Sequence, residues 1–196
     1  KAYVAQVSVL AILAFAIAKN HSLDLNLELS KVSMAIETVI DSKDYIEKLV
    51  KEKLKKRNCF YIGRGIDYYT CLEAALKLKE ISYIQTEGFA AGELKHGTIA
   101  LIEKDVPVIA IITQKKTSHN TRSNIQEVRA SGANSLIIST ENVSDPSDEI
   151  ILPEVHELFS PLLSVVPTQL IAYYKAKQLG LDIDKPRNLA KSVTVE

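Results

Sequence analysis

Short, almost uninterrupted apolar segments alternate with helical segments along most of this sequence, and that alternation limits the folds open to it. The clearest apolar segment is Val106–Thr113 (VPVIAIIT). A strand of this kind is buried on both faces, which is typical of a parallel sheet covered by helices. The other expected strands span residues 59–62, 83–86, 135–139 and 149–152, and the expected helices span residues 69–81, 124–131 and 164–179. We therefore predict an α/β fold, a doubly wound parallel sheet flanked by helices, from about residue 58 to 182.

An N-terminal helical extension is expected before this α/β region. Residues 2–19 are the most apolar part of the chain and predict a buried helix, which Asn20 and His21 would end; residues 23–54 predict two more helices. The first helix is not expected to span a membrane, because polar residues interrupt it and a span needs about 20 apolar residues. The chain has no initial Met and starts inside this helix, so we expect a piece of a longer protein.

Charge and cysteine content argue against several classes of protein. Lys and Arg together number 24, as do Asp and Glu, so a protein that binds mainly nucleic acid or an anionic membrane is not expected. Cys59 and Cys71 form neither a CxxC pair nor a zinc spacing, and both are expected to be small buried residues. His21, His119 and His156 lie far apart and beside no acidic cluster, so no metal site is predicted.

The helical segment at residues 69–81 carries a first set of candidate catalytic residues. Glu73, Lys77 and Glu80 are spaced by four and then three residues, which places all three on one helical face. The commonest explanation of such a face is a solvent-exposed, ion-paired stripe. The alternative is a carboxylate positioned as a general base, with a lysine beside it and a second acid behind. The pattern alone leaves both explanations open.

Glycines mark two further candidate segments. Gly63-Arg64-Gly65 follows a strand and opens a helix, but the third glycine of a dinucleotide fingerprint would fall at Tyr68, so we expect only a tight turn. Residues 87–97 (EGFAAGELKHG) combine glycines with a dense polar set and predict a folded loop. His96 in this loop is the best candidate for a proton carrier near neutral pH, although a capping or structural role is commoner for a histidine.

Three segments together resemble the glucosamine-6-phosphate synthase family: Lys77–Ile81 (KLKEI), Ala91–Gly97 (AGELKHG) and Asp184–Glu196 (DKPRNLAKSVTVE). Their order and spacing fit over essentially the whole chain, and the last segment is the most specific. The family has a glutaminase domain followed by two sugar-isomerase (SIS) domains. The resemblance implies a division into the end of the first SIS domain with a connector, the second SIS domain, and an active-site tail: residues 1–57, 58–182 and 183–196.

The resemblance also implies roles for individual residues. Glu80 would be the base that moves a proton between C1 and C2 of fructose 6-phosphate, with the other two charged residues of its helical face, Glu73 and Lys77, as polar partners. His96 would open the hexose ring of a substrate bound to the neighbouring subunit. Lys191 would form a Schiff base with the open-chain ketose. Beside it, the substrate site would be lined by Ala190.

The implied activity is the isomerase part of the conversion of fructose 6-phosphate and glutamine-derived ammonia into glucosamine 6-phosphate, in amino-sugar biosynthesis on the route to UDP-N-acetylglucosamine. The resemblance implies no metal or organic cofactor, a cytoplasmic homodimer, and no nucleic-acid or membrane partner. The glutaminase and the first SIS domain, which holds the sugar phosphate on a Ser/Thr-rich loop, are missing from this sequence. The matching strand end reads Thr113–Thr117 (TQKKT), so we assign no phosphate site there and expect the chain alone to be inactive.

Two other functions stay open at this point. One is that of a different SIS-family enzyme, a sugar-phosphate deaminase or isomerase. The other is that of a non-catalytic SIS module that binds a sugar phosphate.

Overall fold

The computed structural model describes residues 2–18 and 22–189. The α-helices of this part of the chain are α1 (Ala2–Ile17), α2 (Leu25–Asp41), α3 (Lys43–Lys53), α4 (Ile66–Ser82), α5 (Lys115–Ala130) and α6 (Ser160–Gln178). Its strands are β1 (Asn58–Gly63), β2 (Gln85–Ala90), β3 (Pro107–Ile112), β4 (Asn134–Thr140) and β5 (Ile150–Leu152). Its short 3-10 helices are η1 (Leu94–His96), η2 (Thr98–Leu101), η3 (Glu141–Val143) and η4 (Glu157–Phe159).

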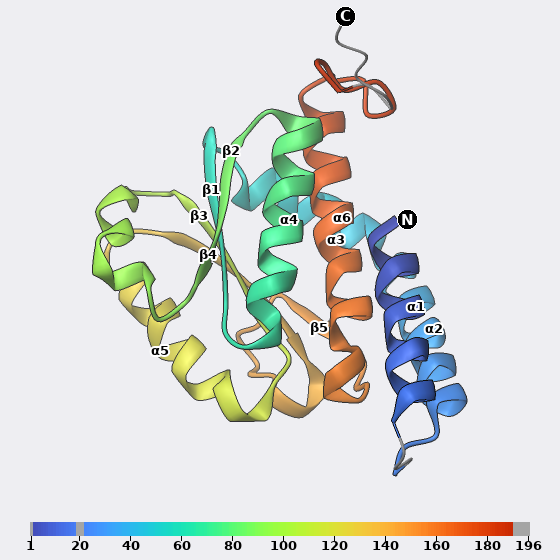
Figure 1. Cartoon of the computed structure of the whole chain (residues 1–196). Coiled ribbons are helices and arrows are strands. Elements are labelled where there is room, and N and C mark those ends of the chain that lie inside the picture. The colour runs from blue at the N-terminus through green and yellow to red at the C-terminus, as the bar shows by residue number, and fades with distance from the viewer. Residues whose placement is uncertain (1, 19–21, 190–196) are drawn as a thin grey trace, which may run out of the picture.

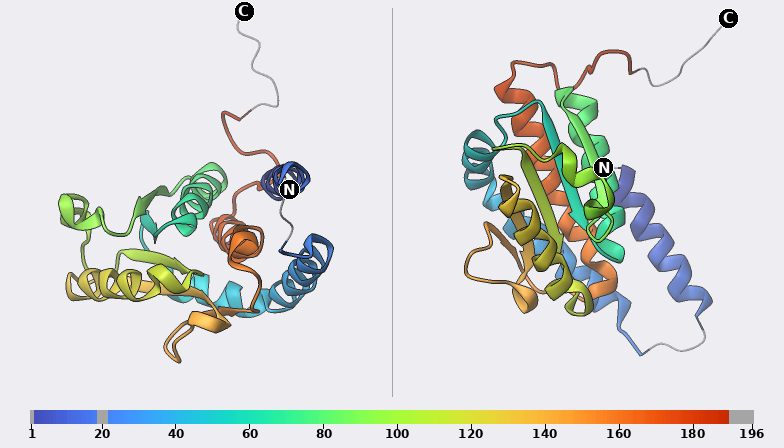
Figure 2. Two further views of the ribbon diagram at one scale, coloured as in Figure 1. Left: turned by 60° about the horizontal axis from the view of Figure 1, so that its bottom comes forward. Right: turned by 90° about the vertical axis from the view of Figure 1, so that its left-hand side faces the viewer.

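The five strands form one parallel sheet in the order β2-β1-β3-β4-β5 (Figure 1). Tyr61 of β1 is in register with Gly88 of β2 and with Ile109 of β3. From β1 the chain winds to one side of the sheet and from β3 to the other, so the winding direction reverses between these two strands. Helices α4 and α6 lie side by side on one face, and α5 covers the other (Figures 1 and 2). The predicted doubly wound α/β fold is confirmed.

Alternate side chains of the central strands enter two separate hydrophobic clusters. In β1, Cys59 and Tyr61 join the cluster under α4 and α6, whereas Phe60 and Ile62 join the cluster under α5. Successive side chains of a strand point to opposite faces, so a strand that is apolar at every position is buried from both sides. Both cysteines, Cys59 and Cys71, are buried, as predicted, and they carry free thiols.

Two predicted boundaries near the sheet were wrong. Helix α5 begins at Lys115, well before the predicted start at residue 124, because its first two turns are polar and its buried residues lie mostly in its second half. Strand β2 spans Gln85–Ala90 and not residues 83–86, because Tyr83 caps α4 in the left-handed conformation with φ 58°. Part of the predicted loop at residues 87–97 is therefore strand. As an edge strand, β2 pairs on one side only and needs no continuous apolar sequence.

The three N-terminal helices form as predicted, but α1 is not a buried helix. None of its residues is buried, and Leu10 keeps 64% of its surface exposed. Tyr3, Val4 and Val7 pack against the core, and α1 lies outside α6 in the three-dimensional arrangement (Figure 1). The reason is that the described part of the chain offers packing partners to one side of α1 only. Within that part of the chain, no helix combines the length and the apolarity that a membrane crossing requires.

Candidate active site

The predicted charged face of α4 is present as a compact ion-pair cluster. The Nζ atom of Lys77 lies 2.7 Å from Oε2 of Glu80 and 3.8 Å from Oε1 of Glu73. The side chains are 33%, 27% and 18% exposed for Lys77, Glu80 and Glu73, so the cluster is partly buried and still open to solvent. The lysine therefore holds both carboxylates in place and compensates their charge. The ion pairing of the commoner explanation is therefore present, but its groups are partly buried and not fully exposed to solvent.

Helix α1 lies beside one end of this cluster. Burial raises the pKa of Tyr3 on α1, and the negative charge of Glu73 on α4 raises it further. The N-terminal end of α1 therefore lies close enough to Glu73 for the two side chains to interact electrostatically. The last carboxylate, Glu80, is in the final turn of α4, at the end of the sheet where β1 and β2 begin.

His96 is not brought near Glu80 within this chain. It ends η1, which follows the carboxyl end of β2, and its side chain is exposed. Helix α4 runs antiparallel to the strands. Its last turn therefore lies at the end of the sheet where the strands begin, whereas η1 follows the end where β2 finishes (Figure 1). A strand of the length of β2 separates these two ends of the sheet by about 20 Å. One copy of the chain therefore cannot apply both side chains to one small molecule.

The two predicted site residues of the tail, Ala190 and Lys191, lie outside the described residues. The segment before them is held at the same end of α4 as Glu80. The backbone N–H of Arg187 donates a hydrogen bond of 2.8 Å to Oη of Tyr83, and the Arg187 guanidinium lies 4.1 Å from the centre of the Tyr83 ring. Such a cation–π contact adds to the anchoring of the segment.

The crevice between β1 and β3, where doubly wound sheets usually bind their ligands, is occupied by side chains of the chain itself. The backbone N–H of Ile66, at the start of α4, donates to Oε1 of Gln114 over 3.2 Å. The backbone N–H of Lys115, at the start of α5, donates to Oε1 of Glu157 over 2.9 Å. Amides of helix N-termini are the groups that would bind a phosphate. Their engagement gives a physical reason for assigning no phosphate site to this strand end.

Asp67, in the first turn of α4, is a buried polar residue of this crevice that the sequence did not reveal. Its carboxylate accepts hydrogen bonds from the backbone N–H of Thr113, at 2.9 Å, and from the Thr113 hydroxyl, at 2.5 Å; that hydroxyl also lies 2.7 Å from Oγ of Ser160. Burial raises the pKa of Asp67 to about 6, against the effect of these hydrogen bonds. An aspartate in a first helical turn usually serves the helix dipole, so no sequence signal pointed to it.

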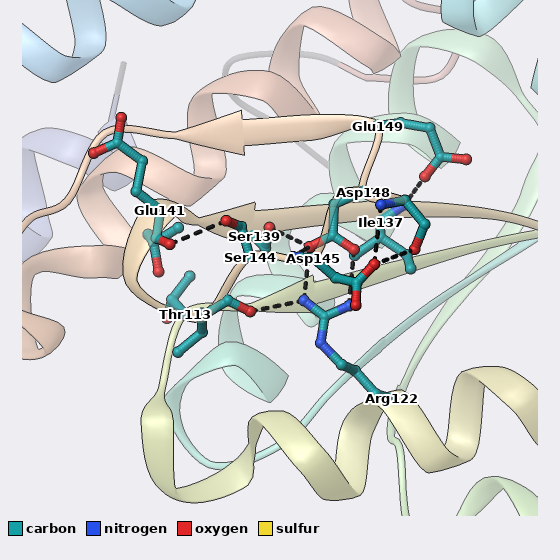
Figure 3. A network of polar contacts seen from close by, with 12 residues as sticks. Thr113, Arg122, Ile137, Ser139, Glu141, Ser144, Asp145, Asp148 and Glu149 are labelled. Carbon is teal, nitrogen blue, oxygen red and sulfur yellow. Dashed lines mark hydrogen bonds and ion pairs between the residues drawn. The ribbon is translucent and has the colours of Figure 1, made fainter.

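A second network that the sequence did not reveal fixes the loop between β4 and β5 (Figure 3). The Arg122 guanidinium donates to both carboxylate oxygens of Asp148, at 2.8 and 2.7 Å, and to the Val143 carbonyl at 2.7 Å. Asp148 also accepts from the Ser139 hydroxyl and from the Asp145 backbone N–H. Burial raises the pKa of Asp148, but these hydrogen bonds outweigh burial and hold it below its usual range. The network binds loop, strand and helix together.

Neither network resembles a metal centre. Over residues 2–18 and 22–189, no group of three or more His, Cys, Asp and Glu side chains is arranged to hold a metal ion.

The sequence and the fold were compared with those of known proteins. The SIS domain family model matches residues 54–176. The chain is 55% identical over 201 aligned residues to a glutamine–fructose-6-phosphate aminotransferase (isomerizing) of Bacillus spizizenii, and 57% identical over 203 aligned residues to one of Streptococcus pneumoniae. Each alignment covers 100% of this chain and 34% of the relative. The chain thus spans about a third of the length of the curated relatives it matches.

Solved structures show the same similarity. The C-terminal domain of glucosamine-fructose-6-phosphate aminotransferase from Francisella tularensis matches with a TM-score of 0.75 and 32% identity, over 81% of this chain and 46% of that one. Glucosamine-6-phosphate deaminase from Thermotoga maritima matches with a TM-score of 0.78 over 99% of this chain and 56% of that one. The second pair is 24% identical, so this likeness concerns the fold alone.

Proposed function

This chain belongs to the SIS domain family, and from that premise we propose that it is the C-terminal sugar-isomerase part of a glucosamine-6-phosphate synthase. Such an enzyme is an isomerizing aminotransferase that converts fructose 6-phosphate and glutamine-derived ammonia into glucosamine 6-phosphate. The observation that carries the proposal is 55% identity over the whole chain to glutamine–fructose-6-phosphate aminotransferases. The product would feed amino-sugar biosynthesis toward UDP-N-acetylglucosamine.

In the proposed reaction, Glu80 moves a proton between C1 and C2. Ammonia condenses with the C2 carbonyl of the open-chain ketose, and the resulting imine acidifies the C1 protons. A carboxylate beside both carbons takes a proton from one and returns it to the other, which yields the amino aldose. Lys77, at 2.7 Å from Glu80, holds the base in position and compensates its charge, with Glu73 behind it. The partial exposure of the Glu80 side chain supports this role, because a substrate can reach it.

The remaining proposed site residues come from elsewhere. Lys191 forms the Schiff base with the C2 carbonyl of the ketose and releases water; ammonia then displaces the Lys191 amine from C2, which gives the imine described above. Ala190 lines the site beside it. His96 opens the hexose ring of a substrate bound to a second copy of the chain, because within one copy His96 and Glu80 lie at opposite ends of the strands. A homodimer is therefore part of the proposal.

The chain division that goes with this function is residues 1–57 for the end of the first SIS domain and a connector, 58–182 for the second SIS domain, and 183–196 for the active-site tail. The missing partners are the glutaminase and the rest of the first SIS domain, which would supply ammonia and hold the sugar phosphate. We expect the 196-residue chain alone to have no synthase activity. We place the whole enzyme in the cytoplasm.

An amino-sugar phosphate deaminase is a weaker candidate. The Thermotoga maritima deaminase shares the fold, but at 24% identity it carries no argument about the reaction. A non-catalytic SIS module is also weaker, because the Glu73–Lys77–Glu80 cluster is intact and ordered by its own ion pairs.

Substitution of Glu80 by Gln in the longer protein tests the proposal. The change keeps the shape of the side chain and removes the base, so we expect kcat to fall by about 100-fold or more. Binding of fructose 6-phosphate and hydrolysis of glutamine by the glutaminase domain should stay near normal. Product formation, and proton exchange at C1 and C2 followed by NMR, give the measurement. The exposed Glu87→Gln in β2 is the matched control. Normal turnover of the Glu80→Gln variant would remove Glu80 from the mechanism.

A further inference from the structure

A basic hollow of about 440 Å³ lies where the helices on one face of the sheet end. The C-terminal ends of α4 and α6 lie side by side there, below residues 181–189 (Figure 1). The residues after α3, at positions 55–57, close the hollow on a third side. The charged face of α4 that carries Glu80 does not line it.

The charge of this hollow is one-sided. Its lining includes five cationic side chains and no acidic one: Lys55, Lys56, Arg57, Lys175 and Arg187. Within the described part of the chain none of these five forms an ion pair, although seven such pairs occur elsewhere in it. Like charges around one hollow repel each other and raise the local concentration of anions.

Of the five cations, Lys175 is the one for which a purely structural role explains the excess of positive charge least well. It is only 9% exposed, and its Nζ atom donates one hydrogen bond, of 2.6 Å, to the carbonyl of Leu54. Burial lowers its pKa, as expected for an ammonium group without a carboxylate nearby. An ammonium group has three donors, so two are left for another acceptor. A buried charge is costly unless it is paired.

Cations near helix C-termini have an ordinary role, which is to offset the partial negative charge of the last carbonyls. That role accounts for the bond from Lys175 to Leu54. It does not account for five cations around one hollow, nor for the way Arg187 is held at the rim. There the contact with Tyr83 fixes the guanidinium and the backbone at once. A planar guanidinium in a fixed place is well suited to bind a phosphate through two hydrogen bonds.

We propose that this hollow is a phosphate-binding site in which Lys175 binds the anion from the floor and Arg187 from the rim. A volume of about 440 Å³ accommodates inorganic phosphate or a small phosphate monoester. The chemistry recognised is the phosphate dianion in either case.

Calorimetric titration of the 196-residue chain with inorganic phosphate, in a low-salt chloride buffer at neutral pH, tests the proposal. We expect saturable binding that Lys175→Met weakens by about tenfold or more, because truncation removes the buried charge that the anion would contact. Arg187→Gln should weaken it as well. Lys177→Met is the matched control: Lys177 lies on the same helix and carries the same charge, but it does not line the hollow. Its affinity for phosphate should match that of the unmodified chain.

A second titration distinguishes the two sources of phosphate. Tighter binding of glucose 6-phosphate than of inorganic phosphate would identify a monoester site, and equal or weaker binding would identify a site for the free ion. Glucose without phosphate should not bind. The proposal is overturned if inorganic phosphate gives no saturable heat up to millimolar concentration. It is equally overturned if Lys177→Met weakens binding as much as Lys175→Met, since affinity would then follow net charge. Circular dichroism confirms that each variant is folded.

Discussion

Asp67 shows how one buried side chain couples the fold to pH. Its carboxylate joins the start of α4 to the end of β3 through two hydrogen bonds from Thr113. Burial raises its pKa to about 6, so the folded protein binds this proton more tightly than the unfolded chain does, whose aspartate has a pKa of about 3.9. The stabilisation that follows is fully present below pH ~4 and is lost as the pH rises through about 6.

Replacement of Asp67 by Asn should remove this pH dependence. The unmodified chain should lose about 3 kcal/mol of unfolding free energy relative to the variant between pH 4 and pH 7, since each pKa unit corresponds to about 1.4 kcal/mol. Urea unfolding of both proteins across that range gives the difference. The exposed Asp105→Asn is the control, because it makes the same exchange of a carboxylate for an amide at the surface of the protein. A constant difference for the Asp67 variant would contradict the raised pKa.

At the scale of elements, the Arg122 network joins parts that are separate in the sequence. Arg122 projects from α5 to Asp148, which lies in the loop between β4 and β5 (Figure 3). The Asp148 side chain has no exposed surface, whereas that of Arg122 is 24% exposed. Loss of the cation would therefore leave a buried carboxylate without its main partner.

Substitution of Arg122 by Met should lower the unfolding free energy by about 3–5 kcal/mol, because it leaves that buried charge uncompensated. Arg129→Met on the same helix is the matched control. Arg129 donates to the neutral hydroxyl of Ser135 over 2.7 Å, so its loss should cost about 1 kcal/mol. Urea unfolding at neutral pH measures both. Equal losses for the two variants would show that a carboxylate acceptor adds nothing beyond a hydrogen bond from a guanidinium to a neutral hydroxyl.

At the scale of the whole molecule, the direction of α4 separates the two proton-handling residues of the proposed reaction. Glu80 lies in the last turn of α4 and His96 beyond the far end of β2. Both serve one substrate only if two copies of the longer protein each contribute one of them. In a symmetric dimer the same pair then occurs twice.

Mixing two inactive variants of the longer protein tests this arrangement. When Glu80→Gln and His96→Asn subunits are unfolded and refolded together, half of the dimers are mixed, and each mixed dimer keeps one site with both native residues. Recovery of about one quarter of native activity is expected for a two-fold symmetric dimer. Either variant refolded alone is the control and should stay inactive. Absence of recovery, with mixed dimers confirmed by mass spectrometry, would contradict a shared site.

Local pattern was sufficient for much of the fold and for part of the candidate site. Apolar strands and their alternation with helices predicted the doubly wound sheet, because a strand apolar at every position must be covered on both faces. The spacing of Glu73, Lys77 and Glu80 predicted their shared face, because the helical repeat alone fixes which residues are neighbours. The two cysteines were correctly predicted to be buried.

Properties that depend on what packs against an element were decided only by the tertiary structure. The apolar sequence of α1 predicted the helix but not its exposure, because burial requires neighbours on every side. The start of α5 and the position of β2 followed from a polar helical surface and a single edge pairing, which leave no periodic signal. Asp67 and Asp148 became buried carboxylates only because distant donors meet them, and Lys175 became a buried cation because α6 ends against α3. The type of most elements followed from the sequence alone, because helical and strand patterns depend on residues that are close along the chain. The burial and the partners of each charged side chain were set only by the tertiary structure, because they depend on contacts between distant elements.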